Sequence, residues 1–251
     1  MVGVEEKVAL VTGAGRGIGR ATAKMLAARG ARVMAVSRSE DELASLGLEH
    51  VAADLSTVEG CTLAVDETVE RLGPIDILVC NHGIGSAHEQ VVWEQDPDVW
   101  AQTMRVNLDG PFHLSRLVLP GMVERRAGRL VFTSSTAGQI AEAAGSAYTS
   151  SKHGLLGLMR SVAVDGGPHN VTSNAVLPGW VRTAMADRSA QTEADERGLS
   201  VDEIWQGRAA LYPPGRVPTA DEVAHLIAFL ASDEASGISG QAIKVALGDL
   251  T

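Results

Sequence analysis

The chain has 251 residues, 45% of them hydrophobic, and a formal net charge of −10 at pH 7. This length allows one or two domains, and the apolar content is ample for a buried core. The acidic balance and the scattered arginines argue against a nucleic-acid-binding surface. No apolar run reaches the roughly 18–20 residues of a membrane span, so we expect no membrane partner.

Strand and helix patterns alternate from end to end, with no linker, low-complexity segment or internal repeat. This alternation predicts one α/β domain over residues 1–251, built on a parallel sheet. The first residues do not form a signal peptide. The two cysteines, Cys61 and Cys80, are expected to stay reduced, as in a cytoplasmic protein. No His, Cys and carboxylate cluster has metal-ligand spacing, so we expect no metal site.

A glycine-rich turn follows the first predicted strand. Val8–Val11 is a short apolar run typical of a buried strand, and Arg20–Arg29 is an alanine-rich segment typical of an amphipathic helix. Between them, Thr12–Gly19 spaces its glycines as G-x-x-x-G-x-G, unlike the strict G-x-G-x-x-G pattern. Backbone N–H groups in such a turn, with the positive end of the helix, bind phosphate. A tight turn without a ligand is the alternative.

The end of the second predicted strand, Ala31–Val36, bears on the choice of cofactor. Folds that bind NAD usually place an acid near this point for the ribose 2′-hydroxyl, whereas an arginine accommodates the 2′-phosphate of NADP. Here Ser37 and Arg38 follow the strand, and Arg16 in the glycine turn adds a positive charge. These residues favour NADP(H), with NAD(H) possible. The arginines could instead be solvated, and the acids at positions 40 and 41 could pair with Arg38.

Polar motifs follow the later strands in chain order. The third apolar run is followed by Asp54-Leu55, and the strand Ile75–Val79 is followed by Cys80–Gly83. The fifth strand, from Leu130, ends in two serines, and the sixth ends in Pro178–Thr183.

Tyr148 and Lys152 are four residues apart in Ala147–Val164, an apolar, turn-free stretch that predicts a helix. Residues at i and i+4 lie on one helix face, which puts a phenol beside an ammonium group. A free tyrosine, with a pKa of about 10, is a poor acid or base near neutrality, and an adjacent cation lowers that pKa. The pair therefore indicates a tuned acid/base group. A surface lysine lying over a tyrosine ring is the alternative.

In this order, the glycine turn, the strand-end motifs and the Tyr-Lys pair resemble the short-chain dehydrogenase/reductase family, over nearly all of the chain. The resemblance implies a single-domain, Rossmann-like doubly wound parallel sheet with helices on both faces. It also implies an oxidoreductase that moves a hydride between a nicotinamide and a carbonyl or secondary alcohol. A homotetramer is implied as well, with the helix around Asn107 and the helix of Tyr148 facing partner copies.

The resemblance implies four catalytic residues. Tyr148 exchanges the proton with the substrate oxygen, Ser135 holds that oxygen, Lys152 binds the nicotinamide ribose and lowers the tyrosine pKa, and Asn107 helps to hold a water near Lys152. An oxygen gaining negative charge needs such donors on physical grounds as well. Ser135 could instead end a strand or cap a helix, with Ser134 the more structural neighbour. Asn107 could equally bond backbone inside a long helix.

The resemblance also implies contacts to the dinucleotide. Thr183 would reach the nicotinamide carboxamide, Val181 would present backbone to it, and Asn81 and Gly83 would line the ribose. The expected cofactor-binding residues are Gly13, Arg16, Gly17, Ile18, Gly19, Ser37, Arg38, Asp54, Leu55, Asn81, Gly83, Tyr148, Lys152, Pro178, Gly179, Val181 and Thr183.

The chain departs from the family pattern in three places. His82 stands where the family usually has alanine, and we expect it to pack and bond locally rather than act in catalysis. The connection from Arg38 to Asp54 is short, so its helix must be brief and the adenine contacts are uncertain. The C-terminal segment 239–248 lacks the paired glycine often seen after the last strand.

Residues 184–215 are polar, acidic and weakly periodic, and we expect a weakly ordered substrate lid there. Two tryptophans, Trp93 and Trp180, and the alanines at positions 141, 143 and 144 could shape an apolar pocket, although each tryptophan is more often core.

Three functions remain open. The first is an NADP(H)-dependent carbonyl reductase, which includes a 3-oxoacyl-carrier-protein reductase as a variant, although we identify no basic patch for an acidic carrier. The second is an NAD-dependent secondary-alcohol dehydrogenase. The third is a cofactor-sensing protein with a dead site, which the presence of all four catalytic residues argues against.

Overall fold

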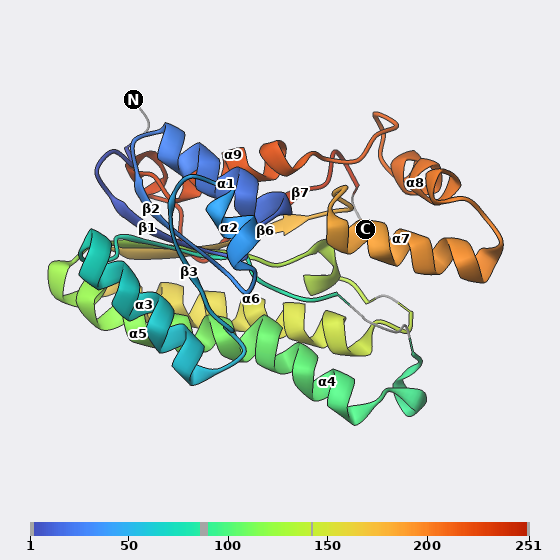
Figure 1. Cartoon of the computed structure of the whole chain (residues 1–251), viewed down its shortest axis with the longest axis horizontal. Coiled ribbons are helices and arrows are strands. Elements are labelled where there is room, and N and C mark those ends of the chain that lie inside the picture. The colour runs from blue at the N-terminus through green and yellow to red at the C-terminus, as the bar shows by residue number, and fades with distance from the viewer. Residues whose placement is uncertain (1–2, 86–89, 142, 250–251) are drawn as a thin grey trace.

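The computed structural model describes residues 3–85, 90–141 and 143–249. Within them, seven parallel strands form one sheet in the order β3-β2-β1-β4-β5-β6-β7 (Figure 1). This arrangement confirms the predicted doubly wound parallel sheet. The strands are β1 (Val8–Thr12), β2 (Arg32–Ser37), β3 (Glu49–Ala52), β4 (Ile77–Cys80), β5 (Gly128–Thr133), β6 (Val171–Pro178) and β7 (Ala242–Val245).

Helices cover both faces of the sheet (Figure 1). Their apolar sides form two cores: α3, α5 and α6 enclose one with Leu10 and Phe132, and α1 and α9 enclose the other with Val11 and Val131. Neighbouring strand residues thus point into opposite cores, which is why these strands read as continuous apolar runs. The helices are α1 (Gly17–Ala28), α2 (Glu40–Ala44), α3 (Val58–Leu72), α4 (Pro97–Met104), α5 (Gly110–Arg125), α6 (Ser146–Gly166), α7 (Ala184–Arg197), α8 (Val201–Ala210) and α9 (Ala220–Leu230).

The strand order reverses direction at β1, which pairs with β2 on one side and with β4 on the other. In an open parallel sheet, ligands bind in the crevice beyond the carboxyl ends of the strands at such a reversal. The glycine turn after β1 and the motifs after β4, β5 and β6 all open onto this edge.

The long helix predicted around Asn107 is present and contains one irregular turn. A π-helical turn, Arg105–Asp109, separates α4 from α5 and contains the buried Asn107. Such turns insert one extra residue and are frequent at functional sites, because they aim a side chain that a regular helix would direct elsewhere.

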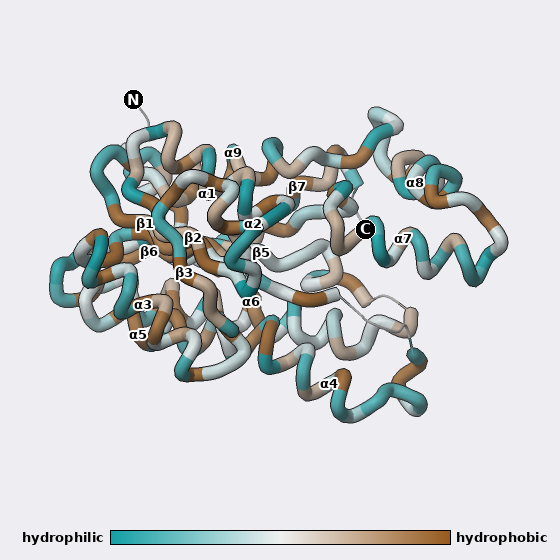
Figure 2. The backbone as a smooth tube through the Cα atoms, viewed as in Figure 1, coloured by the Kyte–Doolittle hydropathy of each residue, from teal (hydrophilic) through white to brown (hydrophobic). Residues whose placement is uncertain are grey.

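The expectation of weak order over residues 184–215 is wrong. The segment forms a helical hairpin, α7 and α8, which lies at one end of the molecule and is hydrophilic along much of α7 (Figures 1 and 2). Figure 2 shows the most hydrophobic backbone along the central strands instead. The hairpin has a small core of its own around Ile204 and Trp205. The hydrophobic periodicity of this segment is weak because α7 contributes only alanines to that core, Ala190 and Ala194.

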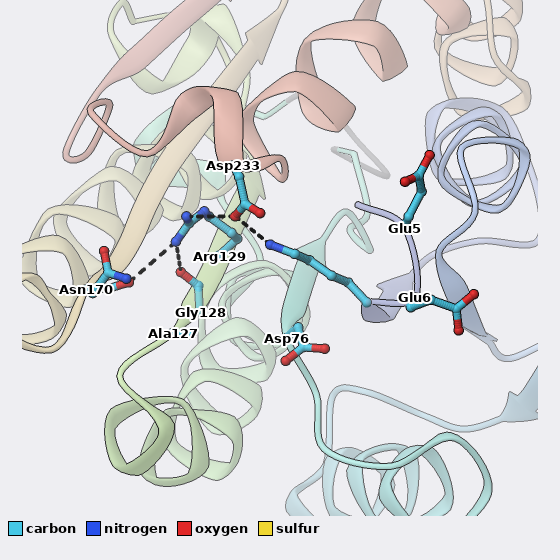
Figure 3. A pocket seen from close by; sticks show the side chains of 9 residues that line it. Glu5, Glu6, Asp76, Ala127, Gly128, Arg129, Asn170 and Asp233 are labelled. Carbon is cyan, nitrogen blue, oxygen red and sulfur yellow. Dashed lines mark hydrogen bonds and ion pairs between the residues drawn. The ribbon is translucent and has the colours of Figure 1, made fainter. Parts of the chain in front are cut away.

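The amino ends of the strands meet at the opposite edge of the sheet (Figure 3). There the Arg129 side chain is only 7% exposed and lies 3.1 Å from Asp233 Oδ1. The same carboxylate oxygen is 2.5 Å from Lys7 Nζ. Because Lys7 precedes β1 and Asp233 follows α9, this cluster joins the two ends of the chain.

Candidate active site

The Tyr148 and Lys152 side chains lie on one face of α6, as their spacing predicts. Lys152 Nζ is 5.5 Å from the centroid of the Tyr148 ring. Lys152 is buried, and its ammonium donates to the backbone oxygen of Thr133, the last residue of β5, at 3.0 Å. The lysine is therefore an interior residue anchored to a strand end, and the surface-lysine alternative does not apply.

Burial also sets the charge state of this lysine. Removal of Lys152 from water penalises its charged form and lowers its pKa from 10.5 to about 8. At neutral pH the side chain still carries its proton and acts as a cation next to the phenol.

Asn107 is completely buried in the π-helical turn and holds the chain that follows β4. Its Oδ1 accepts from the N–H of Ile84 at 2.8 Å, and its Nδ2 donates to Ile84 O at 3.0 Å and to Ser151 Oγ at 3.1 Å. A Cβ placed on Gly83 would lie 3.2 Å from Asn107 Oδ1 and 3.6 Å from Lys152 Nζ, so this glycine keeps the space between them open. Asn107 thus bonds backbone groups, as the alternative to a catalytic role predicts.

Two neighbouring serines after β5 have different surroundings. Ser134 is buried, and its hydroxyl donates to the Lys152 backbone oxygen at 3.1 Å, which ties α6 to the strand end. Ser135 is half-buried, and its oxygen accepts from the N–H of Ala137 at 3.2 Å as the cap of a short 3₁₀ turn. A serine hydroxyl can donate one hydrogen bond while its oxygen accepts another, so Ser135 can also donate to a substrate oxygen.

The glycine turn forms a cradle beside these residues. Gly13 and Gly17 adopt φ values of +65° and +55°, which other residues rarely adopt. A Cβ on Gly19 would overlap Gly13 O and Asn81 Nδ2, so the turn packs directly against the end of β4. Helix α1 begins at Gly17, which leaves the first N–H groups of the helix, including that of Ile18, without intrahelical acceptors.

The segment after β6 forms the facing wall. A Cβ on Gly17 would lie 3.1 Å from Thr183 Cγ2, which brings the threonine against the glycine turn. Val181 is buried below it. Pro178 ends β6, and Gly179 leaves room for the Tyr212 hydroxyl, which accepts from the N–H of Trp180 at 2.6 Å. The structure thus brings the turns after β1 and β6 together.

At the adenine end, the expected residues lie at the edges of β2 and β3. Ser37 is half-buried at the end of β2, and Arg38 is exposed. The exposed Asp54 accepts from the N–H and the hydroxyl of Ser56, at 3.0 and 2.8 Å, and these bonds lower its pKa. Leu55 beside it is buried in the core, where it packs rather than faces the crevice.

Neither Glu40 nor Asp41 forms an ion pair with Arg38. Glu40 pairs with His50 at 2.9 Å, and Arg38 forms no ion pair with any described residue. The acid that reaches the glycine turn is Glu42, whose Oε1 lies 3.4 Å from Arg16. The helix α2 has five residues, which is the brief helix that the short connection predicts.

His82 lies behind the crevice. Its Nδ1 is 2.8 Å from Thr12 Oγ1, and its Nε2 is buried without a hydrogen-bond partner among the described residues. Burial, with the nearby Lys152 charge, lowers its pKa from 6.5 to about 3, so the ring is neutral at physiological pH. Its contacts are local, as expected.

The tryptophans do not form one pocket. Trp93 is 82% exposed, and Trp180 lies 3.7 Å under the guanidinium of Arg208. Arg208 is buried in the hairpin, where it also bonds to Ser189 and Glu193. Arg208 has no sequence signal of this position, because an arginine is rarely a core residue. Among the described residues, no group of three or more His, Cys, Asp or Glu could hold a metal, and both cysteines are free and buried.

These parts define a class of protein. The site combines a tightly packed glycine turn, N–H groups without intrahelical acceptors at a helix start and a Tyr-Lys pair on the same edge. These features fit a nicotinamide dinucleotide, so the site is that of a dinucleotide-dependent oxidoreductase. Residues 7–194 match the family model described as short chain dehydrogenase. The chain belongs to this family, whose members transfer a hydride between the cofactor and a carbonyl or an alcohol.

Named relatives agree with this assignment. The chain is 37% identical to a Streptomyces virginiae protein assigned as the ketoacyl reductase of the monensin polyketide synthase, over 96% of each chain. It is 35% identical to the 3-oxoacyl-[acyl-carrier-protein] reductase FabG of Salmonella typhimurium, again over 96% of each. A solved structure of an actinorhodin polyketide ketoreductase variant with NADPH matches with a TM-score of 0.91 and 32% identity over 99% of both chains.

Proposed function

We propose that this protein is an NADPH-dependent ketoreductase. The observation that carries the proposal is the Tyr148–Lys152 pair, 5.5 Å between ammonium and ring centroid, on the edge where the glycine turn lies. The end of β2 supports NADPH, because Ser37 and Arg38 stand there in place of an acid.

The residues of the chain supply acid/base chemistry in this reaction. When bound, the reduced nicotinamide supplies a hydride for the carbonyl carbon. Tyr148 donates a proton to the carbonyl oxygen, and the Ser135 hydroxyl donates a hydrogen bond to the same oxygen while negative charge develops on it. The Lys152 ammonium favours the phenolate that remains and holds the nicotinamide ribose. Asn107 supports the proton path from Lys152 by fixing the chain around Ile84 and by holding a water.

A 3-oxoacyl thioester is the substrate class that the relatives favour. Two of the named relatives reduce ketoacyl groups, and the third is a polyketide ketoreductase. The α7–α8 hairpin is the proposed substrate lid, since its first residues lie at the nicotinamide end: a Cβ on Gly85 would contact Met185 Sδ at 3.6 Å. An NAD-dependent secondary-alcohol dehydrogenase is the second candidate, and the carboxylate of Glu42 near the end of β2 favours it.

We also propose a cytoplasmic homotetramer. Large apolar side chains are exposed on the helices expected to face partner copies: Trp100 on α4 is 38% exposed, Phe112 on α5 46% and Val164 on α6 75%. Burial of these side chains against second copies would remove apolar surface from water. The two buried, unpaired cysteines suit a reducing compartment. No helix among the described residues is long and apolar enough to cross a membrane.

The test is a screen of ketones, 3-oxoacyl thioesters and secondary alcohols, each with NADPH, NADH and the oxidised forms. We expect reduction of ketones with NADPH, with the 3-oxoacyl thioesters among the better substrates. Oxidation of secondary alcohols with NAD alone would instead select the second candidate. Absence of turnover with every pair would contradict an enzymatic role.

A further inference from the structure

A carboxylate lies at the ribose end of the crevice although β2 does not end in an acid. A Cβ placed on Gly15 would be 2.6 Å from Glu42 Oε2 and 3.0 Å from Ser37 Oγ. The Glu42 carboxylate and the hydroxyl that ends β2 therefore flank the same small space over the glycine turn. The end of β2 is where dinucleotide-binding folds distinguish a ribose 2′-hydroxyl from a 2′-phosphate.

Local structure holds Glu42 in this place. The short α2 is capped by Ser39, whose hydroxyl accepts from the N–H of Glu42 at 3.4 Å. Arg20 of α1 donates to the backbone oxygens of Glu42 and Ser45, both at 3.2 Å, which ties α2 to the start of α1. Gly15 has no side chain, so the carboxylate can occupy the space above it.

Glu42 also engages a cation expected to bind the phosphate. Its Oε1 is 3.4 Å from Arg16, and the two side chains are 38% and 52% exposed. An ion pair of this length and exposure is weak, so Arg16 can exchange it for a phosphate that carries a larger negative charge. Before that exchange, Glu42 both neutralises Arg16 and repels an anion.

We propose that Glu42 is a specificity-determining residue that limits the preference of this site for NADPH over NADH. The inference rests on the proposed function, because it concerns how the same site discriminates between the two cofactors. With NADH, the carboxylate stays where it is and can accept a hydrogen bond from a ribose hydroxyl. With NADPH, it must turn away, and Arg16 is released toward the phosphate.

The experiment measures dissociation constants for NADPH and NADH from the nicotinamide fluorescence, without substrate, in the parent and in Glu42→Gln. This substitution keeps the shape and removes the charge, so we expect the Kd ratio of NADH to NADPH to rise about tenfold, mainly through tighter NADPH binding. Asp41→Asn is the matched control, because it removes the same charge from the preceding residue of α2, and Asp41 forms no ion pair with any described residue.

The outcomes distinguish failure of the role of Glu42 from failure of the proposed ketoreductase function. A ratio that changes less than twofold in Glu42→Gln, or equally in Asp41→Asn, would overturn the role of Glu42 while leaving the ketoreductase proposal intact. Failure of the parent to bind either reduced cofactor would overturn the proposed function and this inference with it. Circular dichroism of both variants checks that they fold as the parent does.

Discussion

Lys152, which we propose acts in catalysis, is buried at a cost to stability. Its ammonium is buried and donates a hydrogen bond to Thr133 O. A fall in its pKa from 10.5 to about 8 means that the folded protein holds this proton less tightly than the unfolded chain does. Its burial therefore destabilises the fold, and we propose that its role is to act on Tyr148 and the cofactor.

Lys152→Met is expected to stabilise the fold while abolishing turnover. At pH 7 the variant avoids the free-energy cost of burying a charge and loses one hydrogen bond. Its free energy of unfolding should therefore exceed that of the parent by about 2 kcal/mol. Between pH 8 and 10.5 the unfolded parent binds more protons than the folded parent, so the parent gains stability as the pH rises. The difference in unfolding free energy between the variant and the parent should thus shrink toward zero by about pH 9.5. Urea unfolding of both proteins at the two pH values checks this, and an advantage that grows with pH would contradict it.

His82 should make the fold sensitive to acid without affecting activity near neutrality. Because its pKa falls from 6.5 to about 3 on folding, the unfolded chain takes up the proton first as the pH drops. The stability that neutral His82 provides at pH 7.5 should therefore decline by about 2 kcal/mol at pH 5. In His82→Ala this decline is absent, so the difference in unfolding free energy between parent and variant should narrow by that amount. An unchanged difference would mean that the ring already titrates normally.

At the scale of elements, the sequence predicts those parts whose signals are local. The strand and turn around Gly13–Gly19 follow from an apolar run and glycine spacing, and the helix of Tyr148 and Lys152 follows from periodicity. The π-helical turn at Asn107 could not be predicted, because one inserted residue leaves no local composition signal. The position of Glu42 over Gly15 depends on how two separate segments pack, which spacing along the chain does not report.

The α7–α8 hairpin is the element whose order escaped prediction, and Arg208 explains why. Its guanidinium is stacked 3.7 Å over Trp180 and 5.1 Å from the Trp205 ring, and it bonds to Glu193 at 3.0 Å. A charged residue thus packs within a small core to which α7 contributes only alanines. Hydrophobic periodicity cannot detect a core built in this way.

Arg208→Ala is expected to loosen this hairpin without unfolding the rest of the molecule. The hairpin core is separate from the two cores of the sheet, so hydrogen exchange should accelerate in residues 184–210 and change little in the strands. KM for the substrate should rise about tenfold, with NADPH affinity nearly unchanged. Arg197→Ala is the control, because Arg197 is exposed and bonds to the same Glu193. Equal exchange in the two variants would argue against a central role for Arg208.

At the scale of the whole molecule, the carboxyl ends and the amino ends of the strands carry different groups of residues. The carboxyl ends of the strands carry the proposed catalytic and cofactor-binding residues, whereas the amino ends carry the ion cluster of Lys7, Arg129 and Asp233 (Figure 3). A change at the second edge should therefore alter stability and leave the chemistry unaffected.

Asp233→Asn tests this separation. The variant leaves the 7%-exposed Arg129 and the neighbouring Lys7 without their shared carboxylate, which should cost about 2 kcal/mol of unfolding free energy after allowance for the exposure of Asp233. The ratio kcat/KM should stay within about twofold of the parent. Glu234→Gln, an exposed neighbour, serves as the charge control. A large loss of kcat/KM with normal stability would show that the two edges are coupled.

The most direct test of the account is the turnover of Tyr148→Phe, measured beside its NADPH affinity. The variant keeps the ring next to Lys152 and removes only the hydroxyl that we propose donates the proton. We expect turnover to fall about a thousandfold while the NADPH dissociation constant stays within about threefold of the parent. Turnover within tenfold of the parent would contradict the role assigned to this tyrosine.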